Sequence, residues 1–308
     1  MMEIREKNKI WIIFEKQHFL FCEFKRAGYI VFDPYLGCNK LVPRLFRTAH
    51  FKSKIPFKQL WYRRVPEEEP ALIIIREGVI TEEYLCWIRK QFPRVKILGL
   101  FMNKIKDDNA INILQKYNCE ATTGDPLDAE KYGITTDMSS VYLQHFKVQK
   151  KQPQEDVYYI GRAKKGRVDD LNRILKQLSN QGLTTRVHMV SPYPYGLTFG
   201  KYERPIPYSR ILEELGKTKA ILHLSQGAGS GITFRVMESV VNQIKLITDD
   251  VSIMDTKIYR RENVFIIGKD NWDRIVSFIN TPFVPIETSV IDSLYFETDI
   301  KRYLEKSI

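Results

Sequence analysis

The apolar positions of this chain fall into short continuous runs, and amphipathic stretches separate them. In the first half these runs predict strands at 9–14, 29–32, 71–75, 95–101 and 119–123. Apolar positions that recur every three or four residues predict helices at 19–27, 82–92 and 108–117. Because the strands are apolar along their whole length, both faces of their sheet must be covered, which is typical of a parallel sheet between helices.

One polar segment interrupts this alternation of strands and helices, and the alternation then repeats. Residues 146–155 are polar and include Pro153, so they predict a linker. The second half predicts strands at 157–160, 185–190, 220–224, 245–248 and 264–267, and helices at 167–180, 208–215, 233–242 and 272–279. We therefore expect an α/β protein of two doubly wound, Rossmann-like domains, 1–150 and 151–308, that face each other across a cleft. A last amphipathic helix, 296–306, ends the second domain in sequence, and packing back on the first domain is one arrangement open to it.

Composition narrows the class of protein. The chain has 308 residues, and no apolar run approaches the roughly 20 residues that span a bilayer. The N-terminus lacks the long apolar region of a signal peptide, which predicts a cytoplasmic protein. The four cysteines form no CxxC pair, and the five histidines have no metal-ligand spacing. We expect no intrinsic metal or cofactor.

The net charge of +11 favours an anionic partner, and a basic segment concentrates that charge. Residues 40–64 contain eight lysines and arginines, interleaved aromatics and no acid. Three interpretations stay open: a solvated basic surface, contact with an anionic membrane, and nucleic-acid binding, which no recognised module supports. The residues that we assign to membrane or acceptor contact are Lys52, Lys54, Lys58, Trp61, Arg63 and Arg64.

A glycine-rich turn stands between a predicted strand and a predicted helix in the second half. The run 226–231 contains three glycines, and the free N–H groups and positive dipole of the helix that follows form an anion site. Arg235 and Glu238 lie three residues apart on that helix, opposite its apolar stripe, and therefore side by side. A guanidinium suits a phosphate and a carboxylate suits sugar hydroxyls. The alternative is a tight strand–helix turn followed by a surface ion pair.

Two further segments point to the same sheet edge. The loop 161–167 is bounded by glycines, carries four cations and follows the first strand of this half. Such a loop holds a diphosphate through backbone N–H groups and cations, and Tyr208 precedes a helix where it is placed to border a base. No Walker sequence is present, and the glycine turn does not follow the first strand of the chain as a dinucleotide fingerprint does. The predicted donor-binding residues are Gly161, Arg162, Lys165, Tyr208, Gly229, Ser230, Gly231, Thr233, Arg235 and Glu238.

These motifs resemble the donor domain of GT-B glycosyltransferases that build bacterial capsular, exopolysaccharide and lipopolysaccharide glycans. The resemblance is carried by Tyr159-Ile-Gly-Arg162, Tyr208-Ser-Arg-Ile-Leu212 and, most specifically, Gly231-Ile-Thr-Phe-Arg-Val-Met-Glu238. It implies that Glu238 binds the ribose of a nucleotide sugar and that Arg162 and Arg235 bind its diphosphate. Many retaining members carry a second glutamate eight residues before the ribose-binding one. Ser230 stands there, so retention and inversion both stay open.

The resemblance also implies a soluble or peripheral enzyme that acts on a glycan or lipid-linked acceptor, with helix dipoles and cations in place of a metal. An inverting enzyme needs a base in its first domain. His18, Asp33 and Glu77 follow the first three predicted strands and are the candidates, although His18 is equally explained as a helix-capping residue. A non-catalytic nucleotide-sugar-binding partner, and more remotely a nucleic-acid-binding protein, are the alternative functions.

Overall fold

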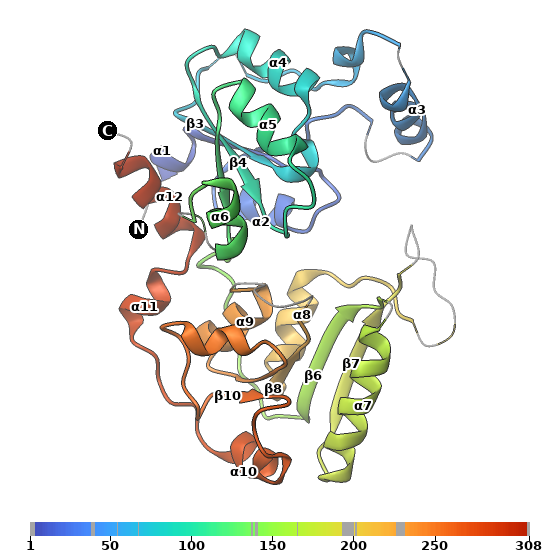
Figure 1. The fold of residues 1–308 in the computed structure, drawn as a ribbon, viewed down its shortest axis with the longest axis vertical. Coiled ribbons are helices and arrows are strands. Elements are labelled where there is room, and N and C mark those ends of the chain that lie inside the picture. Colours follow the sequence, from blue (N-terminus) through green and yellow to red (C-terminus); the bar gives the residue numbers. More distant parts are fainter. Residues whose placement is uncertain are drawn as a thin grey trace. The chain divides into compact units, whose positions relative to one another are not determined.

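The structure, a computed structural model, divides into two compact units (Figure 1). Unit 1 combines Met1–His145 with Tyr295–Ile308, and unit 2 is Phe146–Leu294. The structure describes residues 4–37, 41–53, 55–66, 68–136, 138, 141–164, 166–192, 200, 202–225 and 232–306.

Unit 1 is built on a parallel five-stranded sheet in the order β2-β1-β3-β4-β5. The bounds of these strands are β1 Ile10–Ile13, β2 Ile30–Phe32, β3 Leu72–Arg76, β4 Lys96–Phe101 and β5 Glu120–Thr123. The helices are α1 Ile4–Lys7, α2 Leu20–Arg26, α3 Leu41–Lys52, α4 Glu82–Gln91, α5 Asn109–Lys116, α6 Pro126–Tyr132 and α12 Phe296–Glu305, with short 3-10 turns at η1 Lys58–Trp61 and η2 Glu77–Val79. All five predicted strands are confirmed to within two residues.

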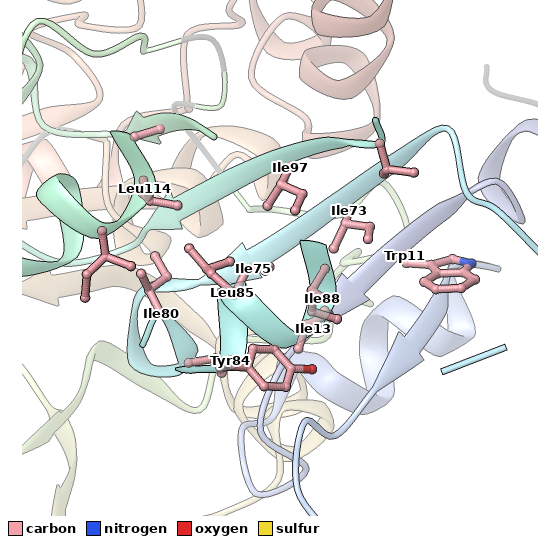
Figure 2. Packing of buried hydrophobic residues seen from close by; sticks show 14 of the residues in the cluster. Trp11, Ile13, Ile73, Ile75, Ile80, Tyr84, Leu85, Ile88, Ile97 and Leu114 are labelled. Atoms are coloured by element: carbon pink, nitrogen blue, oxygen red, sulfur yellow. The ribbon is translucent and has the colours of Figure 1, made fainter. Parts of the chain in front are cut away.

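One face of this sheet packs against α4 and α5. Figure 2 shows Tyr84, Leu85 and Ile88 of α4 directed at the isoleucines of the central strands. Thr81 caps the first turn of α4, because its side chain accepts a hydrogen bond from the backbone N–H of Tyr84. Gly99 of β4 leaves the space that Leu114 of α5 fills, since a Cβ there would lie 2.4 Å from Leu114 Cδ1. Complementary shape therefore fixes how closely α5 approaches the sheet.

The other face of the sheet is covered by α2 and by the last helix, α12. The Phe24 ring of α2 lies 5.4 Å from Phe14 and 4.8 Å from Phe296. The Glu297 carboxylate accepts the backbone N–H of Gln144 at 3.2 Å, which anchors the first turn of α12. The terminal helix thus belongs to unit 1, although the chain reaches it only after unit 2.

Unit 2 repeats the architecture with the strand order β10-β9-β8-β6-β7. The strands are β6 Glu155–Arg162, β7 Thr185–Val190, β8 Thr218–His223, β9 Lys245–Thr248 and β10 Val264–Ile266, all parallel. The helices are α7 Arg167–Asn180, α8 Tyr208–Leu215, α9 Phe234–Asn242, α10 Ile275–Asn280 and α11 Thr288–Asp292, with 3-10 turns at η4 Val251–Asp255 and η5 Trp272–Arg274. Val157 and Tyr159 pack under α7 and α10, so the alternate residue Tyr158 points to the opposite face, which α8 and α9 cover. Two doubly wound parallel-sheet units are therefore confirmed.

The segment predicted as a linker is attached to unit 2. Phe146 is buried, and its ring lies 4.6 Å from that of Tyr208. The backbone N–H of Val148 donates to Asn242 at 2.8 Å, and Lys151 donates to the carbonyl of Gly216 at 2.8 Å. Within the described ranges, no helix is long and apolar enough to cross a membrane.

Candidate functional site

The strand order places a switch point at the carboxyl edge of the unit 2 sheet. β6 is the first strand of this unit, and its neighbours β7 and β8 lie on opposite sides of it. The connections that leave β6 and β8 therefore run to opposite faces, and ligands of doubly wound folds bind at such a switch point. Residues at the ends of β6, β8 and β9 and at the start of α9 lie at this switch point.

Gly161 and Arg162 are the last two residues of β6, whereas the sequence pattern placed them in a loop. Gly161 is required by the tyrosine two residues earlier, because a Cβ there would lie 2.4 Å from the Tyr159 hydroxyl oxygen. Arg167, the first residue of α7, bonds that hydroxyl and also reaches the Ser225 carbonyl beyond β8 at 3.4 Å. Arg167 is one of the four cations of the predicted diphosphate loop, although the predicted donor-binding residues do not include it.

The first turn of α9 presents a capped helix N-terminus at this edge. Thr233 is the N-cap, and its side chain accepts from the backbone N–H of Val236. Arg235 lies on the first turn and forms an ion pair with Glu238 one turn later. The Glu238 carboxylate also accepts a hydrogen bond from the Tyr208 hydroxyl of α8 at 3.0 Å.

Glu238 is buried, which corrects the expectation that it lies on the polar face of its helix. Its side chain is 0% exposed, while that of Arg235 is 19% exposed. α9 buries residues around most of its circumference because Tyr208 and α8 cover the side that periodicity alone leaves open. Burial raises the pKa of Glu238, and the Arg235 guanidinium opposes that rise. The pair is thus a buried charge network and not a solvated surface ion pair.

Tyr208 also has a different environment from the predicted one. Its hydroxyl is directed at Glu238, and its ring packs against Phe146 and, at 5.9 Å, against Phe234. The side chain is buried. Tyr208 therefore positions the Glu238 carboxylate, and its ring packs against aromatic neighbours instead of bordering a nucleobase.

A buried histidine that the sequence analysis missed joins these elements. His223, the last residue of β8, bonds Thr248 of β9 through Nδ1 at 3.0 Å and Thr233 through Nε2 at 3.3 Å. Burial lowers its pKa to about 4, with Asp249 and Asp250 opposing the fall and Arg235 and Arg167 adding to it. His223 is therefore neutral at pH 7 and ties β9 to the α9 N-terminus. Its position at a strand end was the only sequence signal available.

Several predicted residues lie outside the described ranges. They are Lys54, Lys165, Gly229, Ser230 and Gly231.

The three predicted base candidates all lie at the carboxyl edge of the unit 1 sheet. His18 Nδ1 accepts the backbone N–H of Leu20 at 3.3 Å, so it caps the start of α2, and burial with the nearby Arg76 lowers its pKa to about 4. Asp33 is buried and accepts the backbone N–H groups of Tyr35 and Lys16 at 3.1 and 3.4 Å.

Glu77 is half-buried and accepts from the Asn103 side chain at 2.7 Å. Next to it, Arg76 forms an ion pair with Glu15 at 2.8 Å, across the β1–β3 switch point of this unit. Glu15 is a carboxylate at this edge that the sequence analysis did not consider, because it lies just beyond the first apolar run without a motif.

The predicted contact segment is partly paired within unit 1. Lys58 forms an ion pair with Glu83, and Trp61 Nε1 donates to His50 Nδ1 at 2.8 Å. Lys52, Arg63 and Arg64 are exposed. In the part of the chain that the structure describes, no group of three or more His, Cys, Asp and Glu side chains is arranged to hold a metal ion.

Comparison with known proteins finds similarity only among solved structures. No protein-family model matches the chain, and no curated protein does. One of the similar solved structures is described as "Crystal Structure Analysis of the Glycotransferase of kitacinnamycin". The match covers 96% of this chain and 94% of the other chain, with a TM-score of 0.41 and 10% sequence identity.

Proposed function

We propose that this chain is a glycosyltransferase that uses a nucleoside diphosphate sugar and transfers the sugar to a glycan or lipid-linked acceptor in the synthesis of a bacterial surface polysaccharide. The sequence resemblance supports the reaction class and the acceptor. One structural observation supports the donor site: two arginines from different helices lie at the switch point of the unit 2 sheet. Arg167 of α7 reaches the Ser225 carbonyl beyond β8 at 3.4 Å, and Arg235 lies in the first turn of α9, whose N-cap Thr233 bonds His223 at the end of β8.

The chemistry of the transfer requires such an arrangement. The bond between the sugar C1 and the diphosphate oxygen breaks, and the departing diphosphate keeps the electron pair. Guanidinium groups and helix N–H groups stabilise that developing charge. The acceptor hydroxyl forms the new bond to C1 and gives its proton to a base, for which His18, Asp33 and Glu77 of unit 1 remain candidates. In its neutral form His18 carries its proton on Nε2, because Nδ1 accepts from Leu20.

Glu238 is the proposed ligand of the ribose hydroxyls. Its two oxygens already accept from Tyr208 and Arg235, so the ribose must replace or share one of these partners. A buried carboxylate without a partner is costly, so the ribose can bind Glu238 at low cost only by taking the place of one of its present partners. We therefore expect donor binding to move Arg235 toward the diphosphate while the hydroxyls take its place on Glu238.

Calorimetric titration with nucleoside diphosphates tests the site. Arg167→Gln is expected to weaken binding about tenfold or more, since a charge-assisted hydrogen bond contributes about 1.5–3 kcal/mol. Arg173→Gln is the matched control, because Arg173 lies on the same helix with its side chain 79% exposed. Equal affinity in the Arg167 and Arg173 variants, or no binding of any nucleoside diphosphate, rejects the donor site. Binding without release of nucleoside diphosphate from any donor in the presence of glycan acceptors favours the non-catalytic partner.

A further inference from the structure

The helix α3 of unit 1 exposes its apolar side. None of its side chains from Val42 to Lys52 is buried. Its half-buried side is formed by Arg47, His50 and Phe51, the last of which packs 5.4 Å from Tyr35. The opposite, exposed side is a stripe with helical spacing, made of Val42, Leu45, Phe46 and Ala49. An amphipathic helix in a water-soluble unit normally has the reverse orientation.

The segment after α3 extends this apolar surface. Twelve large apolar side chains of the described residues are exposed, and seven of them lie between residues 36 and 60: Leu36, Val42, Leu45, Phe46, Ile55, Phe57 and Leu60. Phe57 is 62% exposed and has a φ of 70°. A left-handed backbone is unfavourable for a bulky residue such as phenylalanine. Because such strain is found mainly at functional positions, the exposed Phe57 ring indicates a contact function. We call these residues, with exposed Lys52, Arg63 and Arg64, the α3–η1 surface.

The apolar side chains of this surface are exposed in the part of unit 1 that the structure describes. Figure 1 shows α3 standing apart from the sheet that α4 and α5 cover. A helix of 12 residues is marginal in water by itself, because most helical stability comes from packing of the apolar face. Among the described residues, only the side with Arg47 and Phe51 packs on unit 1, so the apolar stripe on the other side is available for an apolar medium to cover.

The positive charge of residues 34–66 indicates which kind of partner covers the α3–η1 surface. From residue 34 to residue 66 the sequence contains no acid, and the nearest acids are Asp33 and Glu67. A second copy of the chain seated on this surface would place the same cations opposite one another. An anionic lipid surface instead offers hydrocarbon for the phenylalanines and phosphates for the arginines.

We propose that the α3–η1 surface docks the protein on an anionic lipid bilayer, with α3 lying in the plane of the interface. Its apolar stripe enters the boundary between headgroups and acyl chains, and Lys52, Arg63 and Arg64 contact lipid phosphates. This interaction goes beyond the proposed transfer reaction and does not depend on it.

Flotation of the whole chain with vesicles tests the proposal, with phosphatidylcholine alone compared with a mixture of phosphatidylcholine and phosphatidylglycerol. The wild type should bind the mixed vesicles and should bind the neutral ones much more weakly. Phe46→Ser should reduce partitioning about tenfold, as expected for loss of one buried phenylalanine. The double variant Arg63→Gln/Arg64→Gln should reduce partitioning onto the anionic vesicles by about fivefold for each arginine, and it should not change partitioning onto the neutral ones.

The matched control is Leu127→Ser, which removes an exposed leucine of unit 1 outside this surface, 54% exposed on α6. Circular dichroism checks that every variant keeps the fold, as substitutions of exposed side chains should. Three results overturn the proposal: no binding to anionic vesicles, equal binding to neutral ones, or equal effects of Phe46→Ser and Leu127→Ser. A concentration-dependent dimer that Phe46→Ser dissociates, without vesicle binding, assigns the surface to a second copy and also overturns it.

Discussion

Removal of Arg235 should destabilise unit 2 through the charge that it leaves behind. Arg235→Met keeps most of the aliphatic stem but takes the counter-charge from Glu238, whose side chain is 0% exposed. Breaking a buried ion pair by removing one partner costs about 3–5 kcal/mol, because the remaining charge is desolvated without compensation. The Tyr208 hydroxyl is the partner that remains and offsets only part of this cost.

The same reasoning gives the pH dependence. The pKa of Glu238 in the folded chain is raised above its ordinary value of 4.5, so the folded state binds the proton more tightly than the unfolded state does. Stability therefore falls as pH rises through the folded pKa. Without Arg235 that pKa rises further, so the defect of the variant should be full at neutral pH and should fade as pH falls toward 4.5.

Urea unfolding followed by circular dichroism measures the defect, and hydrogen exchange of peptides from α9 and β9 locates it, since a chain of two units need not unfold in one step. The double variant Arg235→Met/Glu238→Gln is the control, because a glutamine still accepts from Tyr208 and carries no charge. It should recover most of the lost stability. A double variant as unstable as Arg235→Met, or a loss below about 1 kcal/mol in the single variant, would refute the buried-charge explanation.

Two further predictions concern the residues that position the site. Gly161→Ala should lower the free energy of unfolding by about 1–3 kcal/mol in thermal or urea unfolding, because its Cβ would lie 2.4 Å from the Tyr159 hydroxyl oxygen. Adding Tyr159→Phe should restore part of the lost stability. If the effects of the two substitutions are simply additive, the crowding is not between these two residues. Thr233→Ala should lower the free energy of unfolding by about 1 kcal/mol because it removes the α9 cap, and it should increase hydrogen exchange in the first turn of that helix. Thr233→Ser keeps the hydroxyl and should stay close to wild type. Equal behaviour of the alanine and serine variants would contradict a capping role.

Much of the candidate site followed from the order of elements along the chain. Arg162, Thr233, Arg235 and Glu238 were assigned to one sheet edge because the carboxyl ends of parallel strands share an edge. His223 was missed because it belongs to no motif, and only the packing of β8, β9 and α9 brings it to Thr248 and Thr233. Arg167 was predicted only as one of the four cations of the 161–167 loop, and the structure shows that it reaches the Ser225 carbonyl. The environment of Glu238 was predicted incorrectly because helical periodicity does not reveal which neighbouring helix covers a polar position.

The sequence by itself determined the strands, most of the longer helices and the class of fold, since apolar period and strand–helix alternation are local properties of the chain. It predicted no bounds for the helices α1, α3, α6 and α11. It predicted every strand of both sheets, including β7 at 185–190. Tertiary structure decided what depends on contacts distant in sequence: α12 returns to unit 1 beside Phe24, Tyr208 closes over Glu238, and α3 turns its apolar stripe outward. Burial is a property of the neighbours that surround a residue, and the periodicity of one segment does not specify those neighbours.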